Sequence, residues 1–221
     1  MSIRLVVFDC DGVLVDSERL AVRVDQQVLA LMGWDLPLEE VIERFVGSGH
    51  AAMRLALSER LGRDLPHDWD EPYTEMYWAA FRDGLTAIDG AAASLAALDA
   101  AGLPTCVASN STVPQMEYTL GLTGLLPLVE GRLFSGQDHG RPKPDPEVYL
   151  RAAAAMGVPP KDAVAVDDSP AGVAAAVAAG MHVIGFSGGL HPADRLLAAG
   201  AHALAPDHTE VQHRLDHLAG N

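Results

Sequence analysis

The stretch IRLVVFDCDGVLVDSE, which spans residues 3–18, begins with a short and mainly apolar run and then turns acidic at Asp9 and Asp11. A run of this kind, with little polar alternation, is typical of a strand that is buried on both faces of a parallel sheet. Ligands of open α/β sheets bind beyond the carboxyl ends of the strands, so acids at this position are placed for chemistry. The stretch therefore predicts a core strand with a reactive tip.

Three more apolar runs follow, and Ala-, Leu- and Val-rich stretches of helical character separate them. They span residues 103–108, 163–166 and 183–186. The helix signals are clear in the stretch where Ser169 can cap a helix that starts at Pro170 and stops at Gly180. The alternation of strands and helices predicts an α/β fold in which helices cover both faces of a parallel sheet.

The segment 17–84 differs from the rest of the chain because it is rich in aromatic residues, including all three tryptophans. Its apolar residues recur at helical spacing, as at Leu20 and Val24, with no strand-like run between them. We therefore expect a core domain formed by residues 1–16 and 85–221, and an inserted helical domain formed by residues 17–84. The alternative, in which these helices pack on the sheet as ordinary crossovers, stays open.

The chain of 221 residues carries a formal net charge of -15, and 49% of its residues are hydrophobic. This charge repels nucleic acid and anionic lipid, and no basic patch or long uncharged apolar stretch offsets it, so neither nucleic acid nor a membrane is expected as a partner. Cys10 and Cys106 lack metal-binding spacing, which favours buried packing roles. The first apolar run is too short for a signal peptide, and a cytoplasmic location is expected.

Polar residues of reactive type also follow two of the other apolar runs. Ser109 and Asn110 follow the second run, and Asp167 and Asp168 follow the third. In a parallel sheet these tips converge with the acids of the opening stretch. Four carboxylates at one place repel one another unless a hard cation keeps them ionised, and oxygen ligands favour Mg²⁺. A single aspartate is more often a helix cap or turn residue, but the set indicates a Mg²⁺ site.

Lys143 is the candidate cation for an anionic substrate in this acidic chain. It lies in RPKPDP, residues 141–146, where three prolines keep the loop extended. Together with Ser109 and the backbone amides that follow the strands, Lys143 would form a phosphate cradle beside the metal. The alternative for Lys143 is a solvated loop lysine.

Four segments of the chain, taken in order, resemble the four motifs of the haloacid dehalogenase superfamily. They are FDCDGVLVDSE at residues 8–18, VASNS at 107–111, KPDP at 143–146 and VDDSPAG at 166–172. The resemblance covers essentially the whole chain and implies a Rossmann-like core. The helical insertion between the first two motifs is similar to the cap domain of the beta-phosphoglucomutase-like branch, which implies a role in substrate specificity.

The resemblance implies a role for each matching acid. Asp9 would be the nucleophile that becomes an aspartyl phosphate, and Asp11 would be the general acid and then the general base. Asp9, the backbone carbonyl of Asp11 and Asp168 would hold Mg²⁺. Asp167 would be a direct or water-mediated partner of the same ion.

The resemblance also implies a phosphate site, in which Ser109 and Lys143 hold the phosphoryl oxygens and Asn110 binds at the same place. His50 is a further candidate for substrate binding, with a surface role as its alternative. The implied activity is that of a Mg²⁺-dependent phosphatase acting on a small phosphorylated metabolite such as a sugar, sugar-acid or polyol phosphate. The segment LFSGQD, residues 133–138, favours sugar-phosphate and 6-phosphogluconate phosphatases over phosphoglycolate phosphatases.

Other functions compete with this interpretation. Dehalogenases lack the second aspartate of the first motif, so Asp11 favours phosphate chemistry. A phosphomutase of the beta-phosphoglucomutase type has a histidine where this chain has Ala21 and a cap arginine where it has His50, and both differences favour hydrolysis. A phosphorylated signalling module would lack the large insertion, and a non-catalytic phosphate-binding protein would lose Asp9 or Asp11. We expect a monomer or a weak dimer.

Overall fold

The computed structural model describes residues 2–46 and 49–219, apart from the side chains at 49–51. The chain divides into two compact units. The first, called the core unit here, consists of residues 1–16 and 86–221, and the second, called the helical unit, is Ser17–Leu85. Each unit contains buried apolar side chains of its own.

The core unit is built on a sheet of six parallel strands in the order β3-β2-β1-β4-β5-β6. The strands are β1 (Leu5–Phe8), β2 (Thr105–Ser109), β3 (Leu133–Ser135), β4 (Ala163–Asp167), β5 (His182–Phe186) and β6 (Ala203–Ala205). Strands β2 and β3 extend the sheet on one side of β1, and β4, β5 and β6 extend it on the other side. Ligands of doubly wound sheets bind at such a reversal of strand order.

The predicted α/β fold is confirmed, because the four apolar runs of the sequence correspond to β1, β2, β4 and β5. The strands β3 and β6 were not predicted. Each is only three residues long, and two of its three residues are partly exposed. Such short strands do not form an apolar run that stands out from the surrounding sequence.

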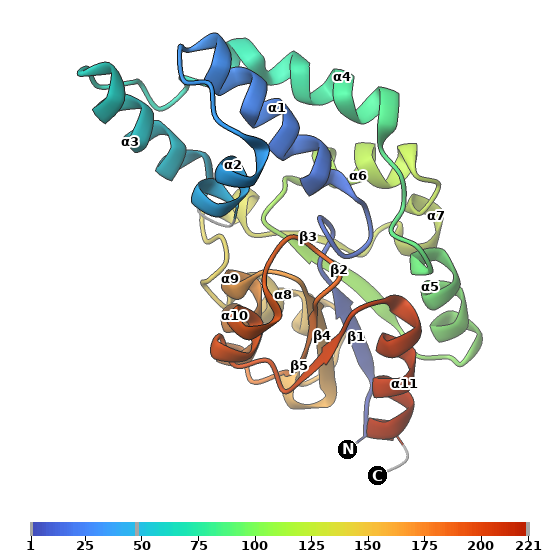
Figure 1. Ribbon diagram of the computed structural model, residues 1–221. Helices are drawn as coiled ribbons and strands as arrows, with labels where there is room; N and C mark the ends of the chain where they lie inside the picture. Colours follow the sequence, from blue (N-terminus) through green and yellow to red (C-terminus); the bar gives the residue numbers. More distant parts are fainter. Residues whose placement is uncertain (1, 47–48, 220–221) are drawn as a thin grey trace. The chain divides into compact units, whose positions relative to one another are not determined.

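Helices cover both faces of the sheet, which explains why β1 shows so little polar alternation. The helices of the core unit are α5 (Ala91–Ala100), α6 (Val113–Leu122), α7 (Leu126–Val129), α8 (Glu147–Ala155), α9 (Pro170–Ala178), α10 (Ala193–Ala198) and α11 (His208–Ala219). Helices α8, α9 and α10 lie on one face, and α5 and α11 lie on the other (Figure 1). Leu5 and Val7 pack into the cluster formed with α8 and α9, whereas the ring of Phe8 lies 6.1 Å from that of His208 in α11.

Two helices begin directly behind strand tips, and side-chain caps fix where they start. The Oγ of Ser169 accepts a hydrogen bond from the N–H of Gly172 at 3.0 Å, and Pro170 is the first residue of α9, as predicted. Thr112 caps α6 and forms a capping box with Gln115. These caps leave short, defined loops between β2 and α6 and between β4 and α9.

The helical unit consists of α1 (Ser17–Leu31), α2 (Leu38–Phe45), α3 (Gly49–Leu61) and α4 (Thr74–Gly84), with a 3₁₀ turn at Glu71–Tyr73. Its described backbone forms no strand, in agreement with the helical spacing of its apolar residues. The hydroxyl of Tyr77 donates to Asp25 at 2.5 Å and so ties α4 to α1. In neither unit does the described part of the chain include a helix both long and apolar enough to cross a bilayer.

Candidate active site

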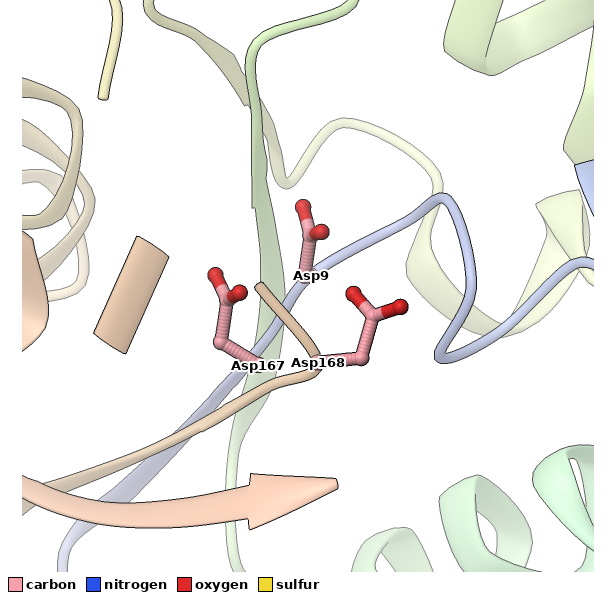
Figure 2. Close-up of side chains that lie close together, drawn as sticks. All are labelled: Asp9, Asp167 and Asp168. Atoms are coloured by element: carbon pink, nitrogen blue, oxygen red, sulfur yellow. The ribbon is translucent and has the colours of Figure 1, made fainter. Parts of the chain in front are cut away.

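Three neighbouring strands deliver polar side chains to one edge of the sheet. The register of β1 and β4 brings Asp9, the first residue beyond β1, level with Asp167 at the end of β4. Ser109 ends β2 on the other side of β1. Figure 2 shows the carboxyl groups of Asp9 and Asp167 close to that of Asp168. The convergence expected from the strand tips is therefore present.

The loop of residues 10–15 folds back tightly after β1 and approaches Asp168. Within it, the N–H of Gly12 donates to the carbonyl of Val15 at 2.9 Å. Gly12 has a φ of +77°, and a Cβ there would lie 2.1 Å from Oδ2 of Asp168, so only glycine fits. A Cβ at Gly189, in the loop after β5, would lie 2.5 Å from the same atom. Two glycine backbones thus form a narrow cradle around this carboxylate.

Lys143 reaches two of the acids from the loop that precedes α8. Its Nζ lies 2.8 Å from Oδ1 of Asp9 and 2.8 Å from Oδ2 of Asp167, and its side chain is only 3% exposed. Burial by itself lowers the pKa of Lys143, but the carboxylates of Asp167 and Asp9 outweigh that effect and raise it well above its usual value. The lysine is therefore a fixed positive charge beside Asp9.

Asp167 is completely buried and accepts hydrogen bonds on both oxygens. Its Oδ2 accepts from Lys143 at 2.8 Å and from the hydroxyl of Tyr149 at 2.6 Å. Its Oδ1 accepts from the N–H and the hydroxyl of Ser169 at 2.9 and 2.8 Å. The sequence reasoning missed Tyr149, because one tyrosine in an alanine-rich helix gives no sign that its hydroxyl reaches a distant carboxylate.

Asp11 is bound to the tip of β2 by two hydroxyl groups. Its Oδ2 accepts from Ser111 at 2.7 Å and from Ser109 at 3.3 Å. The Oγ of Ser109 in turn accepts from the N–H of Ser111 at 3.0 Å. Ser111 stands in the second motif, but its bond to Asp11 becomes evident only when the two strand tips are placed together.

Asn110 uses both polar atoms of its side chain on the backbone of Lys143. Its Oδ1 accepts from the N–H of Lys143 at 2.7 Å, and its Nδ2 donates to the carbonyl at 3.3 Å. The amide of Asn110 therefore fixes the loop that carries the lysine, and a direct contact with phosphate stays a prediction.

The carboxylate cluster fits a divalent cation. Asp9, Asp167 and Asp168 are buried, and each offers an oxygen within 4.8 Å of the others. Burial raises the pKa of Asp9 to about 8, an effect that Lys143 opposes and Asp167 and Asp11 reinforce. A cation would reverse this shift and keep the carboxylates ionised, and hard oxygen ligands suit Mg²⁺. Because Asp167 already accepts four hydrogen bonds, Asp9 and Asp168 are better placed as direct ligands.

The predicted site residues of the core unit lie together at the ends of β1, β2 and β4 and in the loop before α8. They are Asp9, Asp11, Ser109, Asn110, Lys143, Asp167 and Asp168. His50 belongs to α3 of the helical unit. Its side chain lies outside the described part of the chain, so its expected contact with substrate stays a prediction.

Comparison with known proteins gives consistent similarities. The haloacid dehalogenase-like hydrolase family matches residues 3–180. The 6-phosphogluconate phosphatase of Escherichia coli K12 is 37% identical over 190 residues, which are 86% of this chain and 85% of that protein. A haloacid dehalogenase family hydrolase of Deinococcus radiodurans R1, solved with bound phosphate and sodium, is 34% identical with a TM-score of 0.84, covering 99% of this chain and 97% of its own.

A candidate beta-phosphoglucomutase of Thermotoga maritima is also similar in structure, with 26% identity and a TM-score of 0.79 over 97% of this chain and 99% of that chain. The resemblance drawn from the four motifs is thereby confirmed. The family match includes every strand tip that contributes to the site, from Asp9 to Asp168. By both its sequence and its architecture, this chain belongs to the haloacid dehalogenase-like hydrolases.

Proposed function

We propose that the protein is a Mg²⁺-dependent phosphatase that hydrolyses a small phosphorylated metabolite, such as a sugar, sugar-acid or polyol phosphate. The observation that carries the proposal is the carboxylate of Asp9 at the tip of β1, with the ammonium group of Lys143 at 2.8 Å. A buried carboxylate beside a fixed cation suits transfer of an anionic phosphoryl group. Similarity to a 6-phosphogluconate phosphatase supports this substrate class.

The proposed reaction has two half-reactions that share one proton-transferring group. Asp9 attacks phosphorus, an aspartyl phosphate forms, and the bond from phosphorus to the substrate oxygen breaks. Asp11 donates a proton to that leaving oxygen and then accepts one from the water that hydrolyses the aspartyl phosphate. The hydrogen bonds from Ser109 and Ser111 to Oδ2 of Asp11 support this role, because they orient the carboxyl group.

Asp9, the backbone carbonyl of Asp11 and Asp168 are the proposed ligands of Mg²⁺, with Asp167 acting from outside the direct ligand set. When bound, the ion would offset the negative charge of the phosphoryl oxygens and keep the nucleophile ionised. Ser109 and Lys143 are the proposed contacts of the transferring phosphoryl group. Asn110 supports Lys143 through its backbone, as their two hydrogen bonds indicate.

The choice of substrate is assigned to the helical unit, with His50 as its candidate contact. A screen of phosphorylated sugars, sugar acids and polyols in the presence of Mg²⁺ tests the proposed activity through the release of inorganic phosphate. A generic aryl phosphate serves as the reference substrate, and Asp9→Asn serves as the inactive control. Failure of the wild-type protein to release phosphate from any of these compounds would contradict the phosphatase and favour a non-catalytic phosphate-binding module.

A phosphomutase is the competing activity, and the structural similarity to a candidate beta-phosphoglucomutase keeps it worth testing. Ala21 stands where that branch has a histidine, which supports hydrolysis. The assay supplies beta-glucose 1-phosphate, Mg²⁺ and a trace of the 1,6-bisphosphate, and measures glucose 6-phosphate and free phosphate separately. We expect free phosphate to form faster, and the opposite order would establish the mutase.

A further inference from the structure

Asp167 stands out among the acids of the site because its hydrogen-bonding capacity is fully used. An ionised carboxylate offers about four lone-pair positions, and Asp167 accepts four hydrogen bonds, two on each oxygen. The backbone of α9 closes off the same group, since a Cβ at Gly172 would lie 1.9 Å from its Oδ2. Asp167 is therefore saturated by protein donors and acts as the counter-ion of Lys143.

Tyr149 completes this arrangement from α8. Its side chain is fully buried, its hydroxyl lies 2.6 Å from Oδ2 of Asp167, and the Nζ of Lys143 lies 5.0 Å from the centroid of its ring. Burial raises the pKa of Tyr149 well above its usual value, and Asp167 raises it further. The hydroxyl therefore stays protonated and donates to the same carboxylate oxygen that binds Lys143.

We propose that Tyr149 is a positioning residue of the phosphoryl-transfer site, which acts through Asp167 to hold the Nζ of Lys143 where it meets Asp9. A lysine side chain is long and flexible, so its position depends on its partners. The ammonium group has three donors, of which Asp9 and Asp167 take two. The third is available for a phosphoryl oxygen, provided that Nζ is shared between the two carboxylates.

Loss of the Tyr149 hydroxyl would upset this sharing. The Oδ2 of Asp167 would have one donor fewer, its attraction for Lys143 would increase, and Nζ would shift toward Asp167 and away from Asp9. Binding of the phosphoryl group and turnover should both suffer, whereas the proposed metal ligands Asp9 and Asp168 would keep their positions. The inference rests on the proposed function, because it concerns the same site.

The variant Tyr149→Phe tests this role, because it removes the hydroxyl and keeps the ring. Its matched control is Tyr77→Phe, which removes a second tyrosine–aspartate hydrogen bond, to Asp25 in the helical unit. We expect kcat for an aryl phosphate and the affinity for inorganic phosphate to fall about 10- to 100-fold in Tyr149→Phe, as for other changes of supporting residues. Calorimetry should show that Tyr149→Phe binds Mg²⁺ with wild-type affinity. The control Tyr77→Phe should bind both inorganic phosphate and Mg²⁺ with wild-type affinity.

Wild-type kcat and phosphate affinity in a folded Tyr149→Phe would overturn the inference. A loss of Mg²⁺ affinity in Tyr149→Phe as large as its loss of phosphate affinity would also overturn the inference, because the hydroxyl would then act through the metal and not through Lys143. The double variant with Asp167→Asn provides a further test, since residues that act through one another are not additive. It should bind phosphate no more weakly than Asp167→Asn alone, and additive losses would contradict the route through Asp167.

If Tyr149→Phe fails to fold, Asp167→Asn serves as the test in its place. This variant changes the acceptor of the hydrogen bond that the Tyr149 hydroxyl donates. The expected result is weaker phosphate binding, with a loss of Mg²⁺ affinity smaller than that of Asp168→Asn, and wild-type phosphate affinity would reject the proposed route. If the wild-type protein releases phosphate from no compound, the proposed function fails separately. In that case the phosphate-binding measurement still decides the role of Tyr149.

Discussion

The two compact units differ in the polar groups that they bury. The core unit buries three aspartates and a lysine at one edge of its sheet, whereas Ser17 and Ser58 are the polar side chains buried among the described residues of the helical unit. Burying charges is costly unless they are paired, so a cluster of this kind indicates chemistry more than stability. Substitutions of the buried charged groups in the core unit should therefore alter turnover and metal binding, whereas substitutions of the buried serines in the helical unit should alter stability.

The largest effect is expected for Asp9→Asn. An amide is a poor nucleophile and a poor metal ligand, so kcat should fall by about a thousandfold or more. The fold should persist because asparagine has the same shape and Lys143 keeps its bond to Asp167. Phosphate release and circular dichroism check both statements, with Asp25→Asn in the helical unit as the matched control. More than a trace of Mg²⁺-dependent activity in Asp9→Asn would refute its role as nucleophile.

The next effect concerns the metal and separates two adjacent acids. Asp168→Asn should weaken Mg²⁺ binding strongly, because Asp168 is a proposed direct ligand. Asp167→Asn should weaken it less, since the oxygens of Asp167 are already used by four protein donors. Calorimetric titration with Mg²⁺ ranks the two variants. If Asp168→Asn matched the wild-type affinity, Asp168 would have to be removed from the ligand set.

The pH dependence of Mg²⁺ binding is a smaller and continuous effect. Burial raises the pKa of Asp9 from 3.8 to about 8, so the metal-free folded protein holds a proton there that Mg²⁺ must displace. Mg²⁺ affinity should therefore rise with pH, by up to about tenfold per pH unit, and level off above about pH 8. A flat affinity between about pH 6 and pH 8 would show that Asp9 is already ionised without the metal.

The raised pKa of Asp9 also makes the stability of the metal-free protein depend on pH. Because the folded pKa of Asp9 lies above the unfolded value, the folded state binds more protons than the unfolded state between the two values. This carboxyl group therefore lowers the stability of the metal-free protein progressively as pH rises from about 4 to about 8. Added Mg²⁺ should raise the melting temperature more at pH 8 than at pH 6, and an equal increase at both would contradict the assignment.

The sequence predicted those elements and site residues that a local pattern marks, and it did not predict contacts between distant parts of the chain. The strand before Asp9 and the helix that begins at Pro170 were predicted because a short apolar run and a capped helix start are local signals. The hydrogen bonds of Tyr149 and Ser111 were not predicted, because they join residues that are far apart in the chain. The role of Asn110 likewise depends on the path of the lysine loop, which no local pattern specifies.

The smallest effect is expected for Ser58→Ala in the helical unit. The Oγ of Ser58 accepts from the buried N–H of Leu65 at 3.0 Å and donates to the carbonyl of Arg54 at 2.8 Å. Alanine would leave that N–H buried without a partner, which should lower the free energy of unfolding by about 1 to 2 kcal/mol. Arg54→Ala should cost less, because its bond to the carbonyl of Leu65 is only partly buried and water can replace it.

Tryptophan fluorescence during urea unfolding suits this measurement, because all three tryptophans lie in the helical unit and report on it alone. The Mg²⁺ affinity of Ser58→Ala should equal that of the wild type, since the proposed ligands belong to the core unit. A lower stability with unchanged metal binding would support the contrast between the two units. If Ser58→Ala instead weakened Mg²⁺ binding as much as Asp168→Asn does, the helical unit would have to contribute to the metal site, and the division of chemistry from packing between the units would fail.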